Sequence, residues 1–168
     1  MATPRTSAGL LLWRRPAAGR GAVEVLAGHL GGPYWARKDE RAWSVPKGEH
    51  GPEEEPLAAA RREFVEETGQ QVPDGEPAPL GSVRQSGGKV VTLWALEGDL
   101  DAEALVCNTF ELEWPPGSGL MQEFPELDRF AWLDLLTAAR LLVAGQVAFL
   151  DRLVEHLGGL DGQYGLDT

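Results

Sequence analysis

The sequence predicts an α/β sandwich with a mixed β-sheet. Two observations carry this prediction: short apolar segments of strand character lie on both sides of a helical segment in mid-chain, and the chain closes on further helical segments. A length of 168 residues, with 43% hydrophobic residues and six tryptophans, is enough for one folded domain with a full core. We therefore expect a single domain over residues 1–168, with its core at about 7–157.

Three extended segments are expected in the first third of the chain. Ser7–Trp13 reads as a buried strand, because its apolar run is short and bounded by turn-prone residues. Ala22–Leu30 alternates apolar and other residues, which is typical of a second strand. A loop rich in glycine and proline follows, and Trp43–Gly48 is a short extended piece limited by Pro46.

The mid-chain helix is expected to run from Pro56 to Thr68, because proline suits a first helical position and Gly69 suits a C-terminal stop. Two strands, 78–85 and 89–98, should follow, joined by a Ser-Gly-Gly turn.

The last third of the chain is expected to hold less sheet. Residues 99–125 read mostly as loop, with 108–114 the one segment of strand character. Residues 134–139 and 145–156 read as closing helices.

Charge and cysteine content limit the functional classes. Lys and Arg total 15 against 26 Asp and Glu, and the net charge of -11 argues against binding to nucleic-acid polymers or to anionic membrane surfaces. A nucleotide substrate remains compatible, since a metal ion inverts the local charge. The lone Cys107 excludes an intrachain disulfide, and the apolar run near the start is too short for a signal or membrane span, so a cytoplasmic protein is expected.

Three glutamates, Glu63, Glu66 and Glu67, share one face of the predicted helix, beside an apolar face that includes Phe64. Neighbouring like charges repel by a few tenths of a kcal/mol per pair. The cluster is therefore either a solvated acidic surface or a site for Mg²⁺, which binds carboxylates together with substrate phosphates and water.

The wider spacing favours the metal site. From Gly48 the sequence runs G-x5-E-x7-R-E-F-x-E-E-x-G, which resembles the signature of the Nudix hydrolases over residues 48–69, here called the box. One position departs from the family pattern, because Gln70 stands where an aliphatic residue is usual. The specified positions are Gly48, Glu54, Arg62, Glu63, Phe64, Glu66, Glu67 and Gly69.

The resemblance implies an α/β/α sandwich and assigns roles to the box. Glu63, Glu66 and Glu67 would hold a catalytic Mg²⁺ or Mn²⁺, and one of them would help to deprotonate the attacking water. Arg62 would orient a glutamate on the helix, and Glu54 would brace the loop. Gly48 and Gly69 would shape the two ends of the box. Lys47 would lend its backbone carbonyl to a metal.

Residues outside the box are also candidates. The family often takes a further carboxylate from a loop before the last strand, where Glu123 and Glu126 stand, although both could simply be loop acids of a very acidic chain. Tyr34, Trp35 and Trp114 could stack on a nucleobase, or could simply pack in the core or at its rim.

The sequence favours a small-molecule nucleotide as the partner, bound by a monomer or homodimer. The run W-x-x-P-K-G at Trp43–Gly48 is similar to that of the diadenosine polyphosphate hydrolases, and Lys47 would meet an inner phosphate. Those enzymes often carry a tyrosine 16 to 18 residues past the box, where Ser86, Gly87 and Gly88 stand here. Hydrolysis of a dinucleoside polyphosphate is therefore favoured. A nucleoside triphosphate pyrophosphohydrolase and a non-catalytic Nudix-like sensor are the alternatives.

Overall fold

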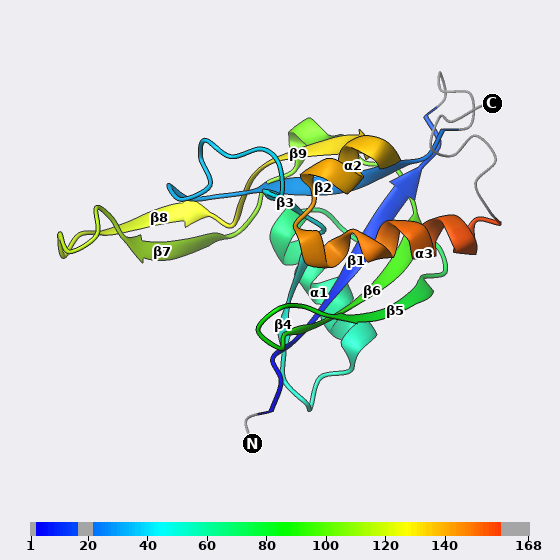
Figure 1. Cartoon of the computed structure of the whole chain (residues 1–168), viewed down its shortest axis with the longest axis horizontal. Helices are drawn as coiled ribbons and strands as arrows, with labels where there is room; N and C mark the ends of the chain where they lie inside the picture. The colour runs from blue at the N-terminus through cyan, green and yellow to red at the C-terminus, as the bar shows by residue number, and fades with distance from the viewer. Residues whose placement is uncertain (1–2, 17–21, 159–168) are drawn as a thin grey trace.

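A mixed β-sheet forms the middle of the molecule in the computed structural model, which describes residues 3–16 and 22–158 (Figure 1). The strands lie in the order β3-β2-β1-β6-β5, with β4 also paired to β1 and β9 to β2. β1 and β6 run parallel, and the other pairs are antiparallel. The strands are β1 (Thr6–Arg14), β2 (Glu24–Leu30), β3 (Trp43–Ser44), β4 (Lys47–His50), β5 (Ala78–Arg84), β6 (Val90–Glu97) and β9 (Leu127–Asp134).

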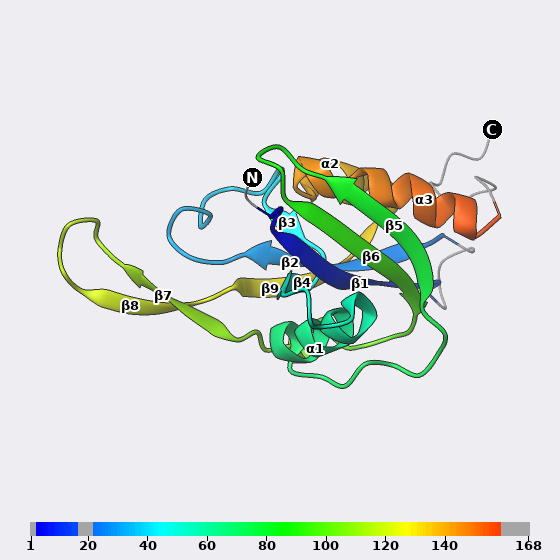
Figure 2. The same ribbon diagram turned by 90° about the horizontal axis from the view of Figure 1, so that it is seen from below.

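Helices cover both faces of this sheet, so the predicted α/β/α sandwich is confirmed. Figure 2 shows α1 (Pro56–Thr68) on one face, and α2 (Leu135–Leu141) with α3 (Ala148–His156) on the other. Two short 3₁₀ turns, η1 (Ala102–Ala104) and η2 (Ala144–Gln146), complete the helical segments of the described chain. Within the described residues, no helix combines the length and apolar character needed to span a membrane.

The central strand β1 explains why the sheet needs two helical layers. Leu10 and Leu12 belong to the core beneath α1, while Leu11 and Trp13 belong to the core beneath α2 and α3. Successive side chains of a strand point to opposite faces, so an uninterrupted apolar run is stable only when both faces are covered.

The ends of α1 coincide with the prediction. Pro56 occupies the first turn, and Gly69 has φ 70°, a left-handed conformation that costs glycine little. The Gly69 N–H donates to the Val65 carbonyl at 2.8 Å. The inner face of the helix buries Ala60 and Phe64.

Two expectations about the connecting segments need correction. Trp43–Gly48 is not one extended piece but parts of two strands, β3 and β4, and β4 continues to His50. Within residues 99–125, the strand expected at 108–114 is confirmed as β7 (Thr109–Glu113), but the loop expected after it contains a second strand, β8 (Met121–Pro125). The two strands form an arm that projects away from the body (Figures 1 and 2). Glycines and prolines between 115 and 119 mark the turn of this arm, but the acidic residues around them weaken the strand pattern.

The burial of Phe64 allows a test of the two faces of α1. Phe64 is 0% exposed, so Phe64→Ala should lower the free energy of unfolding by roughly 3 kcal/mol through lost contacts and the cavity left behind. Chemical denaturation followed by circular dichroism measures this change. Arg61→Ala, an exposed position on the same helix, should change the free energy by less than about 0.5 kcal/mol. Equal effects of the two substitutions would contradict the assignment.

Candidate active site

The start of β4 lies directly against the acidic face of α1. The backbone N–H of Lys47 donates to Oε2 of Glu67 at 3.0 Å. Gly48 faces the carboxyl group of Glu63, and a Cβ atom at residue 48 would stand 2.0 Å from the Glu63 Cδ. Glycine at residue 48 therefore allows this approach, because a side chain there would displace the Glu63 carboxylate.

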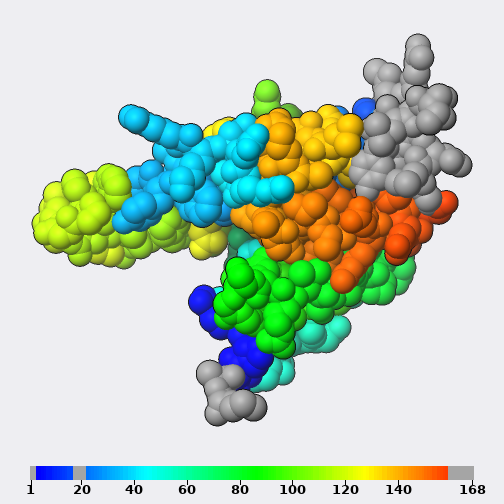
Figure 3. All heavy atoms as spheres, viewed as in Figure 1, coloured from blue at the N-terminus to red at the C-terminus, as the bar shows by residue number. Residues whose placement is uncertain are grey.

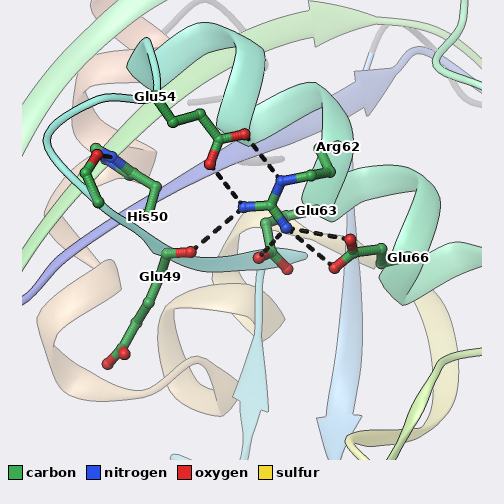
Figure 4. Close-up of polar contacts among 7 residues, drawn as sticks. Glu49, His50, Glu54, Arg62, Glu63 and Glu66 are labelled. Atoms are coloured by element: carbon green, nitrogen blue, oxygen red, sulfur yellow. Dashed lines mark hydrogen bonds and ion pairs between the residues drawn. The ribbon is translucent and has the colours of Figure 1, made fainter.

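The Arg62 guanidinium joins the loop of the box to the carboxylates of α1 (Figure 4). Its Nε and Nη2 donate to the two oxygens of Glu54, each at 2.9 Å, and Nη2 also reaches the Glu49 carbonyl at 3.4 Å. Its Nη1 donates to Glu63 at 2.9 Å and to Glu66 at 3.1 and 3.2 Å. A rigid planar fork suits this task, since one arginine can serve carboxylates on two sides.

A cavity of about 400 Å³ opens between β4, α1 and the start of β9. We call it the acidic cavity, because five carboxylates line it against two lysines. A buried or half-buried set of like charges is unfavourable unless cations are bound there. The charged lining residues are Glu49, Glu63, Glu66, Glu67, Glu126, Lys47 and Lys89, with Asn108 and Ser44 among the neutral ones.

Burial shifts Glu63, Glu67 and Lys47 of the acidic cavity toward their neutral forms. It raises the pKa of Glu67 to about 8, against the opposing effects of the Lys47 backbone hydrogen bond and the Lys47 charge. Burial, together with the negative charge of Glu66, also raises the pKa of Glu63 despite the hydrogen bond from Arg62. Burial and the charge of Lys89 lower the pKa of Lys47. A cation in the cavity would reverse the shifts of both glutamates.

The donor set of the acidic cavity fits a hard divalent cation. Its side chains offer carboxylate oxygens, the ligands that Mg²⁺ and Mn²⁺ prefer. Across residues 3–16 and 22–158, however, no three His, Cys, Asp or Glu side chains stand in a geometry that could already hold a metal. Arg62 accounts for part of this, because it engages the carboxylates of Glu63 and Glu66. Metal binding would require these side chains to turn toward a common point.

The structure separates the two candidate carboxylates near the last strand. Glu126 lies between β8 and β9 and lines the acidic cavity. Its position is fixed by its backbone, since its N–H donates to the Asn108 carbonyl at 3.0 Å and its carbonyl accepts from the Gly31 N–H at 2.9 Å. Glu123 instead lies exposed on the arm, where it accepts a 2.7 Å hydrogen bond from Thr109.

A second cavity, of about 460 Å³, adjoins the acidic cavity and shares Leu30, Ser44, Lys47 and Lys89 with it. We call it the Trp35 cavity, because it contains the one aromatic residue that lines either space. Gln85, Ser86 and the 143–146 segment form much of the remaining wall. The arrangement places a flat aromatic ring and side-chain amides beyond the two lysines.

The loop that carries Trp35 is anchored by His29 of β2. The His29 side chain is wholly buried, with Nδ1 2.9 Å from Oδ1 of Asp128 and Nε2 2.6 Å from the carbonyl oxygen of Lys38.

The other two aromatic candidates lie outside both cavities. Tyr34 and Trp114 contact each other edge to face, with ring centroids 5.3 Å apart, and Tyr34 is 58% exposed.

The residues of the acidic cavity that the sequence did not predict include Glu49, Lys89 and Asn108. Glu49 stands at an unspecified position of the box, and its place directly after Gly48 was the available signal. Nothing local singles out Lys89, because it reaches the cavity through the pairing of β6 with β1. Asn108 arrives through backbone pairing, its N–H donating to the Glu66 carbonyl at 3.1 Å.

Comparison with known proteins places this geometry in context. A family model described as the NUDIX domain matches residues 4–154. An Ap4A hydrolase of C. elegans in a binary complex gives a TM-score of 0.62 at 22% identity, covering 92% of this chain and 99% of that one. The NUDIX domain of Shewanella oneidensis NrtR, complexed with ADP ribose, gives a TM-score of 0.61 at 14% identity, and the match covers 94% of this chain and 90% of that one. The MutT protein of Methanosarcina mazei Go1 gives a TM-score of 0.57 at 20% identity, and the match covers 94% of this chain and 99% of that one. At these identities the structural likenesses show the shared fold. No curated protein matches the chain.

The raised pKa of Glu67 predicts how pH affects the metal-free protein. The folded chain keeps this proton up to about pH 8, whereas an unfolded glutamate loses it near 4.5. The stability that Glu67 contributes is therefore complete below pH 4.5 and is lost as pH rises toward 8. In EDTA, Glu67→Gln should gain stability relative to wild type between pH 5 and 9, by more than about 1 kcal/mol. Urea unfolding at both pH values measures this.

A matched control for the pH experiment is Glu55→Gln, because Glu55 is exposed and makes no side-chain cap hydrogen bond at the start of α1. Its stability should follow the wild-type curve at both pH values. Parallel curves for Glu67→Gln and wild type would show that burial does not hold the proton on Glu67.

Proposed function

Since the chain belongs to the Nudix family, we propose that it is a pyrophosphohydrolase that uses Mg²⁺ or Mn²⁺ to hydrolyse a phosphoanhydride bond in a nucleoside polyphosphate. The observation that carries this proposal is the acidic cavity, where the box glutamates, Glu126 and Lys47 come together. Family membership supports an enzyme of this class. The metal, the individual roles and the substrate are our inferences from the contacts in the site.

We assign the metal-binding role to Glu63, Glu66 and Glu67, with Glu126 as a further carboxylate and the Lys47 carbonyl as a backbone ligand. The bound metal would neutralise charge on the diphosphate and make water a stronger nucleophile at neutral pH. One of the three box glutamates would accept the proton of that water. All of these groups belong to residues that line one cavity, which supports a shared task.

Arg62 acts as a positioning residue in this proposal. Its side chain contacts Glu63 and Glu66, and the two hydrogen bonds that it donates to Glu54 fix the plane of the guanidinium. When a metal draws the two helix carboxylates away, the bonds to Glu54 and the Glu49 carbonyl would hold Arg62 in place. Gly48 keeps open the space that the Glu63 carboxylate occupies.

Two adjoining cavities support a substrate with a nucleobase and a long phosphate chain. Lys47 and Lys89 stand on the boundary between the acidic cavity and the Trp35 cavity. A base stacked on Trp35, which contributes roughly 1–3 kcal/mol by this type of contact, would direct its phosphates past both lysines to the carboxylates. We therefore favour a dinucleoside polyphosphate such as diadenosine tetraphosphate.

One observation favours a second candidate. Ser86, Gly87 and Gly88 stand where the diadenosine polyphosphate hydrolases often have a tyrosine, and this supports a nucleoside triphosphate pyrophosphohydrolase instead. The likenesses to the C. elegans Ap4A hydrolase and to MutT of M. mazei, at 22% and 20% identity, do not separate the two. A sensor without catalysis is disfavoured, because all the box glutamates are present.

The metal-binding role predicts the effect of removing single charges. Glu66→Gln and Glu67→Gln should each lower kcat by about 100-fold or more at saturating Mg²⁺, because the amide keeps the shape but binds metal poorly. EDTA should abolish wild-type turnover, and Mg²⁺ or Mn²⁺ should restore it. Product release from a nucleotide panel, resolved by ion-exchange chromatography, measures both effects.

Glu55→Gln serves as the control, since Glu55 belongs to the box loop but does not line the acidic cavity. Its kcat should stay within about twofold of wild type. Full turnover in excess chelator, or wild-type kcat in both glutamate variants, would contradict the metal-binding role. The box glutamates would then be a solvated acidic surface.

The substrate assignment predicts a selective effect at Lys47. Lys47→Ala should lower kcat/KM for diadenosine tetraphosphate by about 10-fold or more, and by less for ADP-ribose, because a longer chain gains more from a lysine between the two cavities. The measurement is kcat/KM for diadenosine tetraphosphate, ATP, dGTP and ADP-ribose. A strong preference for dGTP, with Lys47→Ala near neutral, would instead favour the triphosphate pyrophosphohydrolase.

A further inference from the structure

A third hollow, of about 320 Å³, lies at the end of the sheet where β1 and β6 begin. We call it the basic hollow, because its lining includes Arg5, Arg84 and Lys89 and no carboxylate. Three cations around one hollow stand out in a chain with a net charge of -11. A cluster of cations without acids among the lining residues favours anions.

Strand pairing brings the three cations together. Arg5 and Lys89 directly precede the parallel strands β1 and β6, and the Val90 N–H donates to the Arg5 carbonyl at 2.9 Å. Arg84 ends β5 and pairs with Val90 in the antiparallel register of β5 and β6. The cations therefore come from the ends of three neighbouring strands. Figure 3 shows the beginning of the chain (dark blue) against the β5–β6 segment (green).

The positive charge of the basic hollow is only partly neutralised. Glu49 forms ion pairs with both Arg5 and Lys89, the latter at 3.5 Å. The Arg84 side chain has no hydrogen bond or ion pair with any part of the chain that the structure describes. One exposed guanidinium thus remains available to a ligand, and its planar fork matches the geometry of a phosphate.

The glycines of the β5–β6 turn keep the basic hollow open. Gly87 and Gly88 both have φ 88°, and a Cβ at either position would meet no atom within 4 Å. Most other residues would be strained in this backbone conformation. The tyrosine expected near this turn in a diadenosine polyphosphate hydrolase is thus replaced by open space.

Lys89 connects the basic hollow with the proposed active site, because it lines the acidic cavity, the Trp35 cavity and the basic hollow. We propose that Arg84, with Arg5 and Lys89, binds the phosphates of the substrate that lie farthest from the scissile bond. This inference rests on the proposed function, and it makes Arg84 a residue that selects long phosphate chains over short ones.

The kinetic test compares chain lengths in one variant. Arg84→Ala should lower kcat/KM for adenosine 5′-tetraphosphate by about 10-fold, the loss expected for a charge-assisted hydrogen bond, and for ADP-ribose by less than about twofold. The matched control is Arg140→Ala, which removes the same charge from a residue of α2 that lines none of the three spaces. It should leave both values within about twofold. Equal losses on both substrates in Arg84→Ala would overturn the inference.

A binding experiment keeps the inference independent of catalysis. Isothermal titration with inorganic tripolyphosphate in EDTA needs neither turnover nor metal. Wild type and Arg140→Ala should bind the probe alike, and Arg84→Ala should bind about 10-fold more weakly. If no nucleotide is hydrolysed but this pattern appears, the proposed function fails and the anion site stands. If wild type and Arg84→Ala bind tripolyphosphate equally, the anion site fails whatever the enzyme hydrolyses.

Discussion

The acidic cavity depends first on the contact between Arg62 and the carboxylates around it. Three glutamates within five residues would repel one another, and this single guanidinium offsets the repulsion while bonding the loop of the box to α1. Hydrogen bonds from Arg62, first to Glu54, hold the arginine pKa above its ordinary value, so its charge is permanent. A fixed cation can therefore organise carboxylates that a bound metal would later share.

Helix α1 combines two demands that oppose each other energetically. Its Phe64 and Ala60 stabilise the core, whereas Glu63 and Glu67, 8% and 5% exposed, bury carboxylates against β4. Only glycine at residue 48 allows the approach of Glu63. Burial of these acids lowers the stability of the metal-free protein, and under the proposed function a bound cation would offset this cost.

Local patterns were sufficient to predict α1 and its carboxylate face, because helical period, Pro56 and Gly69 act within a few residues. Strands β1, β2, β5 and β6 were predicted for the same reason, whereas β3 and β4 were expected as one extended piece. Residues brought together by strand pairing were not. Lys89 lines the site only because β6 lies parallel to β1. Trp114 lies outside the site because β7 and β8 form a separate arm. The choice between Glu123 and Glu126 likewise depended on where β8 ends and β9 begins.

The arm also has a consequence for the behaviour of the protein in concentrated solution. Each of its two strands has a single partner, so each presents an outer edge of unpaired backbone groups, and Leu120 and Met121 are 61% and 59% exposed beside them. Such edges are templates for aggregation through intermolecular sheet formation, which charged side chains prevent. Glu111, Glu113 and Glu123 supply those charges here. Neutral residues at these three positions would remove this protection and would make the arm the edge at which chains pair into a common sheet.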